Sequence, residues 1–198
     1  GTYVTNDNGE KEWVGIQPNA KAGDLKFVDH NGDGKITDAD RQYMGSATPK
    51  TTFAFTLGMT WKKLSFSAMF QGVGKVDGFL GRDIIEPLGS QTAMEEHYYD
   101  SFDPSNPTTG KYYPRMTMAN RLNYANMSHW VQDASYLRLK NLQVGYTFKF
   151  GEKSPVERTR IYFSGSNLFT LTKYRVFDPE NGLNTTSFPN SRVYSIGA

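Results

Sequence analysis

Apolar and polar residues alternate strictly along several segments of the chain. The first segment, TTFAFTLGMTW from Thr51 to Trp61, has a large apolar side chain at every second position and Thr, Ala or Gly between them. After Lys62 and Lys63, the segment LSFSAMFQG repeats the alternation. A period of two residues is typical of a β-strand, and a two-residue connection is typical of a hairpin. The pattern predicts an antiparallel hairpin with one apolar and one polar face.

A second pair of alternating segments follows after a long interval. These are SYLRLKNLQVGYTFKF over 135–150 and RIYFSGSNLFTLTKY over 160–174. In the first of them the apolar positions shift by one residue, which predicts a β-bulge near Lys140 and Asn141. The run SRVYSIGA at 191–198 predicts a fifth strand. We therefore expect an all-β fold with about five antiparallel strands.

Strand lengths and connections distinguish two all-β architectures. The expected strands have about 9 to 15 residues, close to the ~9–11 that cross a bilayer obliquely. Short connections, at 62–63 and 151–157, alternate with long ones, at 72–134 and 175–190. This asymmetry is typical of outer-membrane β-barrels, in which aromatic residues at strand ends lie at the membrane boundary. Trp61 is one such residue and Tyr174 is another. The alternation itself also fits a β-sandwich with a solvated exterior, so the pattern alone leaves both folds open.

The string DHNGDGKITDAD, residues 29–40, has the spacing of a calcium-binding loop. Short oxygen-bearing side chains alternate, Gly34 at the sixth position permits a sharp turn, and the seventh residue offers its carbonyl. The predicted metal ligands are Asp29, Asn31, Asp33, Lys35, Thr37 and Asp40. We expect Ca²⁺ before Mg²⁺, in a structural role.

Two features of this loop limit the prediction. Asp40 stands where EF-hands carry Glu, and its shorter side chain makes bidentate closure harder. The flanking segments are too short for EF-hand helices, because AGDLKFV precedes the loop and Gly45 and Pro49 follow it closely. A calcium-operated switch is therefore not expected. The alternative is an Asp/Asn/Gly turn held by its own side-chain to backbone hydrogen bonds.

Composition excludes several functions. The net charge is +2 and the basic residues are scattered, so we expect no nucleic-acid partner. The absence of cysteine excludes disulfides, thiolate nucleophiles and zinc–thiolate sites. His30, His97 and His129 are isolated from one another, without the spacing of a zinc site or a catalytic triad.

One acidic segment, SQTAMEEHYYDSF, could suggest glycosidase carboxylates at Glu95, Glu96 and Asp100. We interpret it as a short helix in a loop, with solvated acids, and predict no enzyme activity. Aromatic residues in and after this segment could stack on sugars, but we expect them to be packing anchors of the loop. They are Tyr98, Tyr99, Phe102, Tyr112 and Tyr113.

Three strings together resemble the carboxy-terminal part of the SusC/RagA family of TonB-dependent outer-membrane transporters. They are the stretch from GDLKFVDHNGDGK to FQGV, ASYLRLKNLQVGYTF and SGSNLFTLTKYRVFDPE, and the resemblance covers about 23–198. It implies a 22-stranded transmembrane barrel, of which this chain supplies about the last five strands. The implied division is an extracellular loop region over 1–50, containing the metal-like loop, and barrel strands with long loops over 51–198. The N-terminal plug and most of the barrel are absent from the chain.

The resemblance also implies a function in the bacterial outer membrane. Family members import oligosaccharides, and in some cases peptides, with a SusD-type surface lipoprotein as a lid and with energy from the TonB complex. The TonB contact belongs to the absent N-terminal part, and membrane lipid would surround the strands. No substrate-binding residue can be assigned from the sequence. The competing interpretation is a soluble calcium-dependent carbohydrate-binding β-domain, which should fold in plain buffer.

Overall fold

The structure is a computed structural model that describes residues 2–5, 9, 11–14, 17, 20–87, 96–106, 112–117, 121–151, 154–175, 178–181 and 188–198. The chain divides into two compact units. The first unit consists of residues 1–44 with 81–127, and the second of 45–80 with 128–198.

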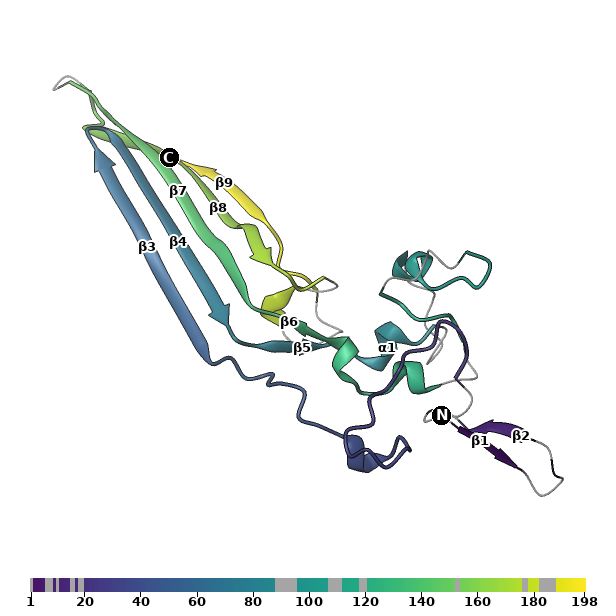
Figure 1. Cartoon of the computed structure of the whole chain (residues 1–198). Helices are drawn as coiled ribbons and strands as arrows, with labels where there is room; N and C mark the ends of the chain where they lie inside the picture. Colours follow the sequence, from purple (N-terminus) through teal and green to yellow (C-terminus); the bar gives the residue numbers. More distant parts are fainter. Residues whose placement is uncertain are drawn as a thin grey trace. The chain divides into compact units, whose positions relative to one another are not determined.

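The second unit is built on a five-stranded antiparallel sheet (Figure 1). Its strands lie in the order β3-β4-β7-β8-β9. Their bounds are β3 Thr51–Trp61, β4 Leu64–Gly74, β7 Tyr136–Lys149, β8 Arg158–Thr172 and β9 Val193–Gly197. The predicted five antiparallel strands are confirmed. The period of two residues locates each strand and specifies its register against its neighbour.

The register sorts the side chains of this sheet into apolar and polar rows. One apolar row comprises Phe55, Phe70, Leu139 and Phe169. Phe55 and Phe70 stack with ring centroids 5.0 Å apart. The adjacent row on the opposite face comprises Ala54, Gln71, Arg138 and Thr170. Apolar residues therefore lie opposite apolar residues, and polar residues opposite polar ones, in these rows of the sheet, as the alternation predicted.

A β-bulge interrupts β7 where the apolar phase shifts. The register jumps from Leu139 to Asn141 against both neighbouring strands, which leaves Lys140 unpaired. On β8 the same irregularity includes Asn167, whose φ is +54°. One extra residue restores a common face for the apolar positions on both sides. The bulge predicted near Lys140 and Asn141 is confirmed.

A short ribbon closes the base of the long connection between β4 and β7. It pairs β5, Asp77–Phe79, with β6, Val131–Asp133, next to the 3₁₀ turn η5, Ser128–Trp130. The ring of Tyr174 is 5% exposed and packs so close to Gly78 that a Cβ there would lie 2.7 Å from the ring. The expectation that Tyr174 lies at a membrane boundary is therefore wrong, because the ribbon buries it, whereas Trp61 is 63% exposed.

The first unit contains short elements only. They are the hairpin of β1, Thr2–Thr5, with β2, Lys11–Val14, the helix α1, Arg82–Ile85, and the 3₁₀ turns η1 Asp38–Asp40, η3 Glu96–Asp100 and η4 Arg121–Tyr124. The β1–β2 hairpin was not predicted. Residues 90–95 of the expected short helix lie outside the described residues, and 96–100 form a 3₁₀ turn. Within the described ranges, no helix has the length and apolar character to cross a membrane.

Candidate functional site

Most of the large side chains on the apolar face of the five-stranded sheet are exposed. Leu57 is 54% exposed and Ile196 is 81% exposed, although both have the character of core residues. Further exposed members of this face are Phe53, Phe55, Met59, Tyr146, Ile161, Phe163, Phe169 and Leu171. A contiguous apolar surface of this kind is rare on soluble monomers and marks a surface that contacts hydrocarbon or another protein.

The opposite face carries hydroxyl, amide and guanidinium groups. Its rows combine Ser67, Gln143 and Ser164, and next to them Thr56, Asn141 and Ser166. Arg160 reaches across this face and donates from Nη2 to Ser65 Oγ at 3.0 Å and to Gln143 Oε1 at 3.3 Å. Water solvates such polar groups well. The two faces of this sheet therefore suit two different environments, one aqueous and one apolar.

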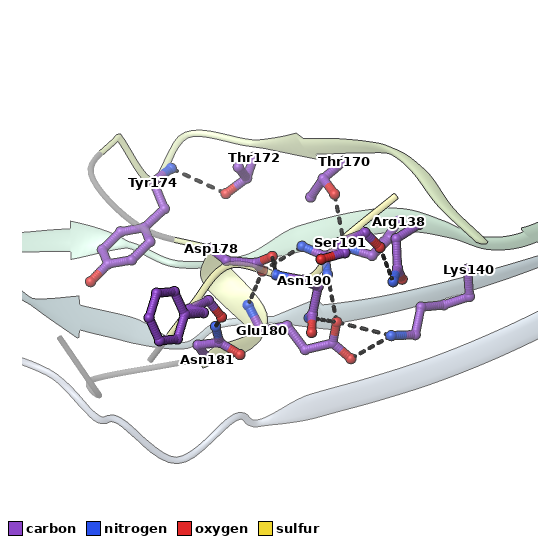
Figure 2. A network of polar contacts seen from close by, with 12 residues as sticks. Arg138, Lys140, Thr170, Thr172, Tyr174, Asp178, Glu180, Asn181, Asn190 and Ser191 are labelled. Carbon is purple, nitrogen blue, oxygen red and sulfur yellow. Dashed lines mark hydrogen bonds and ion pairs between the residues drawn. The ribbon is translucent and has the colours of Figure 1, made fainter. Parts of the chain in front are cut away.

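A network of charged side chains lies on the polar face, where β7 meets the segment after β8 (Figure 2). Arg138 is 2% exposed. Its Nε donates to Thr170 Oγ1 at 2.8 Å, its Nη1 donates to Glu180 Oε2 at 2.6 Å, and its Nη2 donates to Asp178. Lys140 Nζ donates to the two carboxylate oxygens of Glu180 at 2.7 and 2.9 Å. Lys140 lies two positions after Arg138 in β7, so both side chains point to the same face of the strand.

The charges of this network balance. Two cations, on β7, face two carboxylates, of which Asp178 has a side chain only 8% exposed. Burial raises the pKa of Asp178, but the hydrogen bonds from Arg138 and from the backbone N–H groups of Glu180 and Asn190 outweigh it and hold the pKa below its usual value. Asp178 is therefore ionised at neutral pH. A guanidinium this deeply buried is tolerated only with such partners.

The network also fastens the chain that leads from β8 to β9. The 3₁₀ turn η6, Pro179–Asn181, carries Glu180. Asn190 donates its N–H to Asp178 Oδ2 at 3.1 Å and its side-chain amide to Glu180 at 2.7 Å. Asn181 Nδ2 donates to the carbonyl of Phe188 at 2.6 Å. Both ends of the 178–191 segment are thus tied to the polar face of β7.

The predicted metal loop folds through its own hydrogen bonds. The Asp29 carboxylate accepts from the N–H groups of Gly32 at 2.7 Å and Gly34 at 2.8 Å. Asp33 Oδ1 accepts from the Lys35 N–H at 2.8 Å. Gly34 has a φ of +80°, the left-handed conformation that the sixth position of such a loop needs.

The far end of the loop closes on Asp40. Its carboxylate accepts from the N–H groups of His30 at 2.9 Å and Thr37 at 2.8 Å, and Thr37 Oγ1 caps η1 by accepting from Ala39 at 3.3 Å. The Thr37 N–H is the main cause that holds the pKa of Asp40 below its usual value.

The loop thus places all its predicted ligands within one compact turn. Among the described residues, however, no three His, Asp or Glu side chains are gathered as a metal ion would require. The oxygens instead accept from the backbone, as in the alternative interpretation of the sequence. The Ca²⁺ site stays a prediction.

A buried carboxylate organises the first unit. Asp24, from the GDLKF string, accepts from the Lys21 N–H at 2.8 Å, from Arg115 Nε at 2.6 Å and from Asn123 Nδ2 at 2.9 Å. Asn123, fully buried, in turn accepts from the Leu25 N–H at 3.0 Å. The segment around Asp24 is therefore anchored to the 112–124 region by charged and amide hydrogen bonds.

The loop aromatics divide into packed and free rings. Tyr98 and Tyr113 are buried with centroids 6.1 Å apart, whereas Tyr99 is 89% exposed. Phe102 is half-buried against Gly23. Packing is thus the role of the buried pair, as expected. Glu95 and the side chains of Glu96 and His97 lie outside the described residues.

Gly23 offers a test of this packing. Its φ is +87°, and a Cβ there would lie 2.1 Å from Phe102 Cδ1, whereas Gly32, with a φ of +76°, has nothing within 4 Å of a Cβ. We expect Gly23→Ala to lower the free energy of unfolding by about 2–3 kcal/mol, from left-handed strain plus overpacking. Gly32→Ala should lower it by only about 1 kcal/mol, from strain alone.

The measurement is protease susceptibility of the first unit in the intact protein that contains it, across a urea series. Equal losses for Gly23→Ala and Gly32→Ala would contradict the packing of Phe102 on Gly23.

Comparison with known proteins finds TonB-dependent receptors among the relatives of this chain. The chain is 32% identical over 188 residues to TonB-dependent receptor P3 of Formosa agariphila, covering 86% of this chain and 18% of the relative. It is 22% identical over 184 residues to TonB-dependent receptor SusC of Bacteroides thetaiotaomicron, covering 90% of this chain and 18% of the relative. No family model matches the chain.

A solved structure agrees with these relatives. The RagAB peptide importer in its open-open state is 29% identical, with a TM-score of 0.68, covering 93% of this chain and 21% of that chain. The chain thus spans about one fifth of the length of the proteins that it matches. By name, these relatives are receptors and importers.

Proposed function

The chain belongs with the SusC/RagA-type TonB-dependent receptors, and on this premise we propose that it forms part of the wall of a transport barrel in the bacterial outer membrane. The two-faced sheet carries this proposal. Its exposed apolar face suits lipid, and its polar face suits a water-filled passage. The open edges at β3 and β9 would pair with further strands of a 22-stranded barrel.

The proposal assigns roles to the parts of the chain. Residues 51–198 supply strands and long loops, and residues 1–50 supply an extracellular loop region. The plug and the TonB contact belong to parts of the receptor beyond this chain. The polar network at Arg138 would hold the 178–191 segment at the wall of the passage, where it helps to define the space open to cargo.

The cargo that we propose is an oligosaccharide or a peptide, taken up with a SusD-type surface lipoprotein. The peptide alternative is supported by the similarity to the RagAB peptide importer. The oligosaccharide alternative is what the family resemblance of the sequence implies, and it is supported by exposed aromatic rings such as Tyr99, which can stack on sugar faces.

Cell fractionation tests this function. An antibody against residues 20–50 should detect, in the outer-membrane fraction, a polypeptide several times longer than 198 residues, and a lipoprotein should co-purify with it in mild detergent. A soluble monomer of about this length, stable in plain buffer, would contradict the proposal. A calcium-dependent carbohydrate-binding β-domain would then be the better account.

We also propose that the loop 29–40 binds Ca²⁺ as a structural ion. Its spacing supports this, and so does Gly34, whose left-handed φ of +80° is the conformation that the sixth position of a calcium loop needs. Ion binding requires some of the loop's carboxylate oxygens to turn from the backbone N–H groups toward a common centre.

The corresponding prediction concerns Asp29→Ala combined with Asp33→Ala in the intact receptor. The melting temperature should fall by several degrees more in calcium than in chelator, because only the ion-bound loop loses its ligands. Asp38→Ala is the matched control, since Asp38 lies at a non-ligand position and pairs with Arg41 at 2.9 Å. An equal melting temperature of the wild type with calcium and with chelator would exclude the ion.

A further inference from the structure

The turn between β3 and β4 borders an open hollow with a mixed lining. Trp61, Lys62, Lys63, Leu64 and Tyr146 surround about 350 Å³. Lys62 has a φ of +55°, and its Nζ lies 5.0 Å from the centroid of the Trp61 ring. Two aromatic residues and two lysines therefore line one small space at the end of the sheet.

Further cations lie at the same end of the sheet. The Thr147 N–H donates to the Lys63 carbonyl at 2.8 Å, which holds the β3–β4 turn beside β7. Two residues further along β7, Lys149 lies opposite Arg158 of β8 in the strand register. Glu157, next to Arg158, is the acidic residue in the described part of this neighbourhood. The local balance is strongly positive, although the whole chain has a net charge of only +2.

The apolar face runs directly into this hollow. Leu64 and Tyr146 are register partners, and the next apolar row along the sheet contains Met59, Phe66 and Val144. A ligand seated here could place an anionic group on the lysines and hydrocarbon along the sheet face. Inorganic phosphate or a nucleic acid would use the lysines but leave the apolar wall uncovered.

We propose that this hollow binds the headgroup of an anionic glycerophospholipid, with the phosphate held by Lys62 and Lys63 and the glycerol and upper acyl chains against Trp61, Leu64 and Tyr146. The inference rests on the proposed barrel function, because it requires the apolar face to lie in a membrane. Tryptophan and tyrosine suit the boundary between hydrocarbon and water, and lysines bind anionic lipid there.

The other end of the same hairpin supplies a matched control. There the Lys50 N–H donates to the Lys75 carbonyl at 3.3 Å, and Lys75 has a φ of +54°, close to that of Lys62. Replacing Lys50 and Lys75 by glutamine therefore removes the same charge and makes the same change at a left-handed position. The two sites differ in the aromatic hollow and in the cations next to it.

The experiment uses the full-length receptor in neutral detergent micelles, titrated with phosphatidylglycerol or phosphatidylcholine and followed by native mass spectrometry. Each lysine near an anionic lipid surface strengthens binding about fivefold. We therefore expect Lys62→Gln with Lys63→Gln to weaken phosphatidylglycerol binding about 25-fold, and Lys50→Gln with Lys75→Gln to change it less than about twofold. Phosphatidylcholine binding should be weak in all three proteins.

Three outcomes would overturn the inference. They are equal loss of phosphatidylglycerol in both double variants, no loss in either, and displacement of the lipid by millimolar inorganic phosphate, which would assign the hollow to free phosphate. A receptor that resides in the outer membrane but shows one of these outcomes leaves the barrel function standing. A receptor absent from that membrane would instead overturn the barrel function itself.

Discussion

Replacement of Arg138 by methionine should release the 178–191 segment from the polar face of the sheet. The substitution keeps an unbranched apolar stem but removes the guanidinium, which leaves Asp178 and Glu180 facing only Lys140, so that a balanced network acquires a net negative charge. Removing one partner of a buried ion pair costs about 3–5 kcal/mol, because the remaining charge loses its compensation. Since Glu180 keeps partial contact with water, we take the lower end of that range.

Hydrogen exchange in the full-length receptor measures this release. A local loss of about 3 kcal/mol should speed amide exchange in 178–181 and 188–191 by roughly a hundredfold. Arg160→Met is the matched control, since Arg160 lies on the same face but is exposed, with hydroxyl and amide partners. Unchanged exchange in Arg138→Met, or an equal effect of Arg160→Met, would show that the ion pairs do not hold this segment.

Charge placed on the apolar face should disrupt the receptor, whereas the same charge on the polar face should not. Leu57 and Thr56 are consecutive residues of β3, both exposed, and the pleat of the strand directs them to opposite faces. If lipid covers the apolar face, Leu57→Arg costs about 2–4 kcal/mol near the middle of the bilayer. Thr56→Arg faces water and should cost less than about 0.5 kcal/mol.

Urea titration of receptor refolded into phosphatidylcholine vesicles gives this comparison, with the midpoint and slope reported for each variant. The expected order is wild type close to Thr56→Arg and well above Leu57→Arg. If Leu57→Arg and Thr56→Arg shifted the midpoint equally, both faces of the sheet would meet the same environment. That result would contradict the proposal that this sheet is part of a membrane barrel.

The strands could be predicted because their information is local. Strict alternation from Thr51 to Trp61 defines which face each residue occupies, and the two-residue turn at Lys62–Lys63 fixes the pairing of β3 with β4. The phase shift in β7 marked the bulge at Lys140 for the same reason. Register is strongly specified wherever one face is uniformly apolar.

The polar network could not be predicted because its partners are distant in the sequence. Arg138 and Asp178 are 40 positions apart, and their meeting depends on the path of the chain after β8. The same holds for Asp24 with Arg115, 91 positions apart. A lone arginine in an alternating strand reads as one more polar residue, and the strings SYLRLKN and FDPE gave no sign of their contact.

Two predictions made from local sequence, on the strand-end aromatics and on the loop 29–40, show where such information ends. Tyr174 lies just after β8, and Trp61 ends β3, but the β5–β6 ribbon covers Tyr174 and leaves Trp61 exposed. The sequence holds no signal for that difference. The loop 29–40 shows the limit of motif spacing, since the oxygens that could bind an ion are also good acceptors for the loop's own N–H groups.

Cysteine labelling along β8 tests the central claim, that one face of this sheet meets lipid and the other meets water. The chain contains no cysteine, so single cysteines can be placed at successive positions 161–164 of the full-length receptor with other cysteines replaced. In native outer membranes, a charged, water-soluble maleimide should label positions 162 and 164 and leave 161 and 163 unlabelled. Even labelling at all four positions, or labelling confined to 161 and 163, would contradict the account.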